Sequence, residues 1–161
     1  MTQYRDNGAV GAMLDEYEKA IEELLAVISG IKEAELMAVV DSETEDVDCW
    51  SIQTILSHVV RAGYTYTIEM RKYMGEELDY CTNVTLNTIE AYSIALKEMF
   101  AYCEKLFADY PELPLEEDNP ERKMVVRWGQ RYDVEQLMEH AIVHILRHRR
   151  QIERYLLRLR R

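Results

Sequence analysis

The sequence contains few of the residues that interrupt helices, with three prolines and six glycines among 161 residues. This scarcity disfavours a turn-rich β protein and favours long helices. No uninterrupted apolar run approaches the 18 or so residues of a transmembrane helix, so no membrane span is expected. The N-terminus has no basic region followed by an apolar run, so no secretory signal is expected either.

Cysteine is also scarce. Cys49, Cys81 and Cys103 are odd in number and widely separated, which argues against a disulfide framework and against a CxxC motif. Reduced thiols are typical of cytoplasmic proteins, and we expect this location. A chain of this length buries enough apolar surface to fold without cross-links, so residues 1–161 are expected to form a single domain.

Charge is distributed unevenly along the chain. Residues 140–161 contain seven arginines and one acid, Glu153, for a net charge of +6; the total of −11 therefore leaves −17 for residues 1–139. Such an acidic body argues against nucleic-acid binding, which requires neutralisation of phosphates. The basic segment could contact RNA or a membrane, but we favour arginines that complement a helix dipole and pair with acidic neighbouring helices.

Helical periodicity marks four long segments, at about residues 10–29, 50–74, 86–110 and 134–159. Ser51 is a suitable N-cap for the second, and Asp133 with Gln136 has the spacing of a capping box for the fourth. A short extended piece is expected within 123–133. Four such helices predict an all-α four-helix bundle, and the longer connections after the first and third helices leave room for a crossover.

The histidines lie on two of these helices. On a helical wheel, His144 and His148 fall on the apolar face of the fourth helix, one turn apart, whereas His140 falls at its boundary and Glu139 points away. Neutral imidazoles at this spacing suit a divalent ion such as zinc, nickel, iron or copper. A pair of hydrogen-bonded core histidines explains the same spacing equally well.

A third ligand would have to come from another helix. His58 is the remaining histidine, and it lies at the flank of the apolar stripe of the second helix. Two such flanks can meet across a bundle core, so His58 is the candidate for completing a site.

Two stretches resemble the DinB-like family. Residues 50–58, WSIQTILSH, resemble the start of its second helix, where Trp-Ser leads to the first metal-binding histidine. Residues 144–152, HILRHRRQI, resemble its closing motif; Arg150 stands where many members have glycine. The order and separation of the two motifs cover most of the chain.

The resemblance implies a four-helix bundle with a divalent-metal centre whose ligands are His58, His144 and His148. Zinc or nickel are the first candidates for the ion, with iron or manganese as alternatives. The superfamily includes bacillithiol and mycothiol S-transferases and proteins similar to maleylpyruvate isomerase. The resemblance therefore implies a metal-dependent enzyme acting on a small molecule, with a low-molecular-weight thiol as a possible cosubstrate.

Three protein ligands leave a coordination position open, which is typical of catalytic sites. An ion there can act as a Lewis acid or lower the pKa of water or a thiol. The hypotheses are a thiol S-transferase-like or hydrolase-like enzyme, a non-catalytic metal-binding or stress-related dimeric protein, and an interaction module in which the histidines only pack. A homodimer is expected, and the catalytic and substrate-binding residues stay unassigned.

Arg147 and Arg149 flank the histidine face of the fourth helix. Arg147 and Arg149 could each hold an anionic substrate, although ion pairing on the helix surface is the favoured use of both. Trp50 and Trp128 could form walls beside a metal, or serve equally as core anchors.

Overall fold

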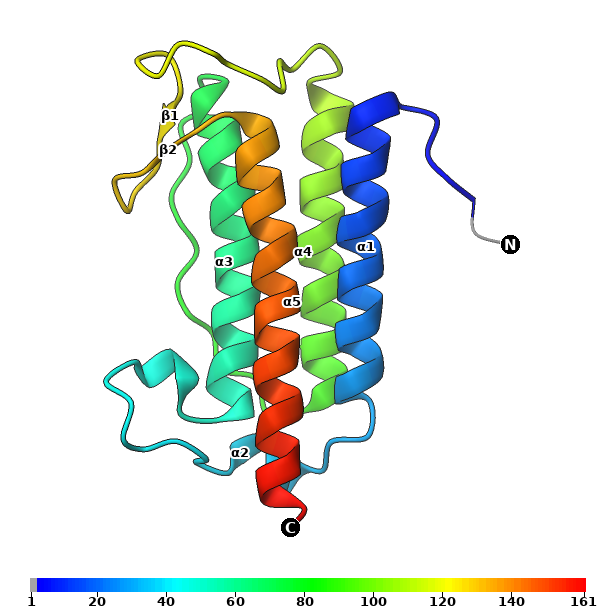
Figure 1. The fold of residues 1–161 in the computed structure, drawn as a ribbon, viewed down its shortest axis with the longest axis vertical. Coiled ribbons are helices and arrows are strands. Elements are labelled where there is room, and N and C mark those ends of the chain that lie inside the picture. Colours follow the sequence, from blue (N-terminus) through cyan, green and yellow to red (C-terminus); the bar gives the residue numbers. More distant parts are fainter. Residues whose placement is uncertain (1–2) are drawn as a thin grey trace.

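The computed structural model describes residues 3–161 and consists mainly of four long helices that lie side by side along the longest axis (Figure 1). A five-residue helix, a one-turn 3-10 helix and a two-stranded antiparallel sheet complete it. In chain order the elements are α1 (Gly8–Ile28), α2 (Glu33–Met37), η1 (Val47–Cys49), α3 (Ile52–Tyr73), α4 (Ile89–Asp109), β1 (Met124–Val125), β2 (Arg131–Tyr132) and α5 (Val134–Leu159). The predicted helical class is confirmed, and so is the extended piece within 123–133.

Side-chain caps fix the starts of the two helices that carry the histidines. Ser51 Oγ accepts from the backbone N–H of Thr54 at 3.1 Å, as the sequence predicts for the start of α3. At the start of α5, Asp133 accepts from the N–H of Gln136 at 2.8 Å, and the Gln136 side chain accepts from the N–H of Asp133 at 3.1 Å. Such caps contribute about 1 kcal/mol each and set the register of the residues that follow.

The second and third long helices run parallel. Near their starts, Tyr92 Oη of α4 donates to the carbonyl of Gln53 in α3 at 3.1 Å; near their ends, Arg71 pairs with Asp109 at 2.9 Å. The chain therefore crosses back along α3 between them (Figure 1). From the sequence, room for a crossover was expected in the longer connections, after the first and third helices. The shorter connection between α3 and α4 is nevertheless long enough to run back along α3, because an extended chain advances about twice as far per residue as a helix.

The four long helices enclose one core. Helices α1 and α3 each pack against both α4 and α5. Gly63 of α3 lies against Met99 of α4, so that an added Cβ there would overlap the sulfur of Met99. Among residues 3–161, no helix is both long enough and apolar enough to cross a membrane.

Candidate metal centre

The three histidines singled out from the sequence come together between α3 and α5. His58 lies in the second turn of α3, and His144 and His148 lie one turn apart near the middle of α5. His144 Nε2 lies 2.9 Å from His58 Nε2 and 3.1 Å from His148 Nε2. His144 and His148 are buried, whereas the side chain of His58 is 25% exposed. This group can hold a metal ion, since its three candidate ligand atoms all lie within 4.8 Å of one another.

The outward-facing nitrogens of two of these rings have acceptors. Asp48 Oδ2 lies 3.2 Å from Nδ1 of His58, and Gln151 Oε1 lies 2.9 Å from Nδ1 of His148. Each acceptor favours the tautomer with its proton on Nδ1, which leaves the Nε2 lone pair directed at the centre. Arg61 Nη2 also lies 3.5 Å from Nδ1 of His58, but the carboxylate is closer. Partners of this kind orient metal-binding histidines and make them more basic.

This arrangement leaves a conflict that a cation would resolve. With protons on Nδ1, the Nε2 atoms of His58 and His148 are both acceptors that face His144. The single Nε2–H available to His144 can satisfy only one of them. A cation at the centre would satisfy all three lone pairs. Metal–nitrogen bonds of about 2.1 Å place ligand nitrogens about 3.0 to 3.4 Å apart, close to the spacing here. The donor set therefore fits a divalent ion.

Asp48 reaches His58 because the chain before α3 is held in place. Asp46 caps η1 by accepting from the N–H of Asp48 at 3.1 Å, and Tyr155 of α5 donates to the carbonyl of Cys49 at 2.5 Å. Arg61 donates to Asp48 Oδ2 at 2.8 Å, so the carboxylate joins two residues of α3.

Sequence reasoning missed both supporting residues. Gln151 belongs to the closing motif and follows His148 by three residues, a spacing that places two side chains on one helix face and could have indicated its role. Asp48 lies among several acids in a loop without periodicity, and no local pattern distinguishes it from Asp46 or Glu45.

Burial keeps the site uncharged at neutral pH. Burial, together with smaller effects of the neighbouring His148 and His58, lowers the pKa of His144 to about 2. Burial likewise lowers the pKa of His148 to about 4 and also lowers that of His58, against the opposing effects of Gln151 and Asp48 respectively. Neutral imidazoles are the form that binds metal ions, so few protons compete for this site above pH 6.

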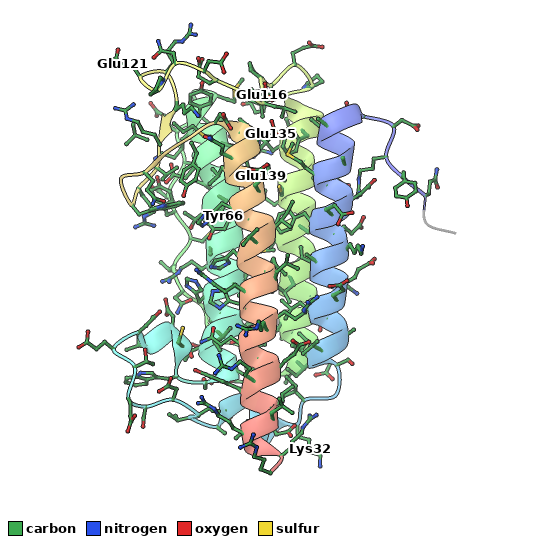
Figure 2. All side chains as sticks on the ribbon, viewed as in Figure 1. Lys32, Tyr66, Glu116, Glu121, Glu135 and Glu139 are labelled. Atoms are coloured by element: carbon green, nitrogen blue, oxygen red, sulfur yellow. The ribbon has the colours of Figure 1, made fainter. Side chains whose placement is uncertain are left out.

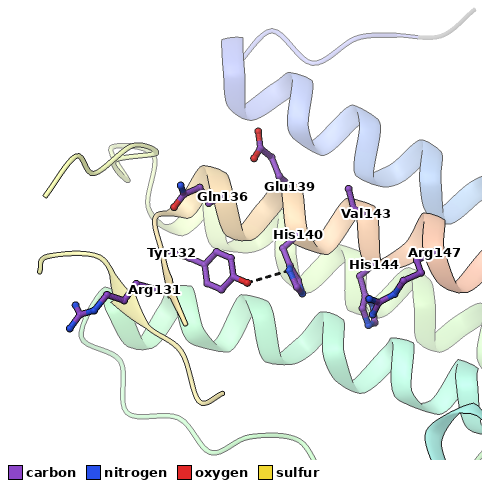
Figure 3. A pocket seen from close by; sticks show the side chains of 8 residues that line it. All are labelled: Arg131, Tyr132, Gln136, Glu139, His140, Val143, His144 and Arg147. Atoms are coloured by element: carbon purple, nitrogen blue, oxygen red, sulfur yellow. Dashed lines mark hydrogen bonds between the residues drawn. The ribbon is translucent and has the colours of Figure 1, made fainter. Parts of the chain in front are cut away.

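His140 lies outside the triad, as its position on the wheel predicts. It is half-buried, its Nδ1 lies 3.4 Å from Tyr132 Oη, and its ring stacks against His144 with centroids 6.3 Å apart (Figure 3). Glu139 is exposed and points away from His140 in the same view. The burial of these α5 residues therefore matches the prediction, with His144 and His148 inward, His140 at the boundary and Glu139 outward.

The flanking residues have different roles. Arg149 forms an ion pair with Glu23 of α1, which confirms surface pairing for this residue. Arg147 forms no ion pair within residues 3–161. Neither tryptophan is a core anchor, since Trp50 is 38% and Trp128 is 40% exposed. Trp50 donates to the carbonyl of Thr44, and only Trp128 of the two lines a cavity described below.

Two cavities border the centre. The first, here called the Trp128 cavity, has a volume of about 650 Å³ and lies on the side of His58 and His144. The second, the Gln151 cavity, has about 560 Å³ and lies on the side of His58 and His148. His58 and Arg147 line both. Each volume suits a small organic molecule, and the partly exposed His58 stands at the junction.

Together, the fold and site define a helical protein with a candidate three-histidine metal centre. No family model matches the chain, and comparison with curated proteins also finds no match. Its function must therefore be argued from the site.

Proposed function

We propose that the protein is a divalent-metal-dependent enzyme of the DinB-like superfamily, built as a four-helix bundle with a crossover, which acts on a small molecule. The observation that carries the proposal is the convergence of three neutral imidazole nitrogens from two helices, two of them supported at Nδ1. The motifs around His58 and His144 lie in the order that the DinB-like resemblance implies.

The residues around the centre suit a reaction rather than a closed structural site. His58, His144 and His148 would hold the ion, and a bound ion would supply Lewis acidity and lower the pKa of a thiol or water in its open position. Asp48 and Gln151 hold two of the rings in the orientation that binding requires. Tyr66 and Trp128 form an aromatic wall beside His144, with ring centroids 5.9 Å apart.

Thiol S-transfer is the reaction that we favour over hydrolysis. Two cavities meet at His58 and Arg147, which provides room for two organic substrates beside one centre. In such a transfer, the thiol sulfur forms a bond to an electrophilic carbon, the bond from that carbon to its leaving group breaks, and the thiol proton passes to solvent. A homodimer in the cytoplasm belongs to the same proposal, and sedimentation equilibrium tests the dimer.

Metal analysis of the purified protein tests the centre. We expect one equivalent of a divalent ion per chain, zinc or nickel before iron or manganese, with His58→Ala and His148→Ala losing it. His140→Ala is the matched control, since this histidine lies on the same helix but outside the triad. Absence of stoichiometric metal, with no difference between wild type and His58→Ala, would leave only the packing role for these histidines.

Conjugation of 1-chloro-2,4-dinitrobenzene to small thiols tests the chemistry. Metal-loaded wild type should accelerate thioether formation and chloride release with at least one thiol, and His148→Ala should lose most of that rate. An undiminished rate in His148→Ala would contradict metal-dependent catalysis. Metal binding without acceleration across a panel of thiols would instead identify a non-catalytic metal-binding protein.

A further inference from the structure

The lining of the Trp128 cavity differs in charge from the rest of the molecule. It contains Arg61, Arg127 and Arg147 but no aspartate or glutamate, although the whole chain carries a net charge of −11. The labelled acids Glu116, Glu121, Glu135 and Glu139 lie around the end of the molecule where α5 begins, close to the cavity residue Tyr66 (Figure 2). A cavity lined by one sign of charge concentrates ligands of the opposite sign.

Two of these arginines have charges that no acid neutralises. Arg61 is paired with Asp48, but the guanidinium groups of Arg127 and Arg147 form no ion pair and donate no hydrogen bond within the described part of the chain. Arg127 lies over the ring of Tyr80, with its guanidinium carbon 4.2 Å from the centroid. Arg149 of α5 and Arg160, just beyond it, pair with acids, whereas Arg150, Arg154 and Arg158 form no ion pair within the described residues. Arg147 differs from these three because it lines the Trp128 cavity beside His144.

Of these two arginines, Arg147 is the better placed to contact a ligand beside the three histidines. It follows His144 by three residues and precedes His148 by one, and it lines the Trp128 cavity, the Gln151 cavity and the smaller cavity drawn in Figure 3. A guanidinium at this point can contact a ligand group beside the three imidazoles from either side.

The remaining wall suits a flat, apolar body. The rings of Tyr66 and Trp128 meet edge to face at 73°, with Ala62 also lining the cavity. Thr65, Thr82 and Asn83 add neutral polar groups to the lining. An aromatic or conjugated ligand could lie against the rings while its charged end reaches the arginine.

We infer that the Trp128 cavity binds a small organic anion, with a planar apolar body against Tyr66 and Trp128 and a carboxylate or phosphate held by Arg147. This inference rests on the proposed function, because it names the substrate class of the same centre. A guanidinium binds either anion through two parallel hydrogen bonds, which places the attached group in a fixed orientation.

Tryptophan fluorescence can measure this binding directly. In a Trp50→Phe background, Trp128 is the single tryptophan and reports on the cavity. The probes are benzoate, phenyl phosphate and benzamide, which is the neutral counterpart of benzoate. In metal-free protein we expect one or both anions to bind at least about tenfold more tightly than benzamide, since charge-assisted hydrogen bonds are the stronger ones. Equal binding of all three probes, or binding of none, would overturn the inference.

Two charge-matched variants locate the anion. Arg147→Gln should weaken the binding of the anions about tenfold and leave that of benzamide unchanged. Arg154→Gln removes the same charge from α5, but Arg154 lines only the Gln151 cavity, so this variant should bind as wild type does. Loss of anion binding in Arg154→Gln equal to that in Arg147→Gln, or no loss in Arg147→Gln, would refute the assignment.

Repeating the titrations with zinc-loaded protein separates this inference from the proposed function. If benzoate binds only the zinc-loaded form and is indifferent to Arg147, the anion binds the ion alone; the inference then fails while the metal centre stands. If the protein binds no metal but the Arg147-dependent preference persists, the inference holds as an anion site and the proposed enzyme is rejected.

Discussion

The carboxylate of Asp48, in the one-turn helix η1 just before α3, lies 3.2 Å from Nδ1 of His58. This contact orients the most exposed of the three imidazoles, because α3 alone does not fix the rotation of the ring. The Arg61 guanidinium contacts the same carboxylate at 2.8 Å and helps to hold it in place. The site therefore depends on a residue of η1 as well as on its candidate ligands.

Replacing Asp48 by asparagine tests this dependence. We expect Asp48→Asn to weaken metal affinity about 10- to 100-fold, the usual cost of losing such a partner, with all three histidines still present. Competition with a chromophoric chelator measures the affinity. Glu45→Gln is the matched control, since Glu45 is an exposed acid of the same loop. Equal affinities for Asp48→Asn and wild type would show that the carboxylate does not support His58.

Gln151 should act on His148 in the same way. Gln151→Leu removes the acceptor from Nδ1 and is expected to weaken metal affinity about tenfold or more, whereas Gln151→Glu keeps an acceptor and should retain most of it. Arg150→Gln changes the adjacent exposed position and serves as the control. Similar losses in the leucine and glutamate variants would mean that packing, and not the hydrogen bond, accounts for the effect.

The metal-free protein should become less stable as pH falls from 7 to 5. Unfolded histidines take up protons near pH 6.5, whereas burial keeps the pKa of His144 at about 2 and that of His148 at about 4 in the folded state. The unfolded state then binds more protons, so the free energy of unfolding decreases by roughly 1–2 kcal/mol for each of these histidines.

Urea unfolding at several pH values, after removal of metal by a chelator, measures this dependence. Most carboxylates titrate below pH 5, so the histidines dominate the window. The variant His144→Gln should show a shallower dependence on pH than wild type. Identical slopes for the two proteins would contradict the assignment of the pH dependence to His144.

The close approach of α3 to α4 predicts a steric effect at Gly63. Gly63→Ala places a methyl group on the sulfur of Met99 and should lower the free energy of unfolding by about 1–3 kcal/mol. Gly30→Ala is the control, because no atom lies within 4 Å of the added carbon there. A double-mutant cycle with Met99→Ala should show coupling, and strict additivity would argue against the clash.

Several features follow from local sequence. The caps at Ser51 and Asp133 set where α3 and α5 begin, since each involves residues only three apart. The inward orientation of His144 and His148, and the boundary position of His140, follow from helical periodicity within α5. These features could be predicted correctly because each depends only on the geometry of a single helix.

Other features depend on how the helices pack. The parallel course of α3 and α4, which places the crossover before α4, arises from long-range contacts such as that between Tyr92 and Gln53. The sequence identified Arg147 and Arg149 as flanking residues, but only packing gave Arg149 a partner on α1 and left Arg147 without an ion pair within residues 3–161.

The sequence by itself determined the long helices, their buried faces and two histidines of the centre, because helical periodicity and capping act over a few residues. The tertiary structure decided that His58 meets this pair, that Asp48 orients it, and that an uncompensated arginine lines the adjoining cavity. These contacts join segments far apart in the chain, and their distances depend on helix packing, which no local pattern specifies.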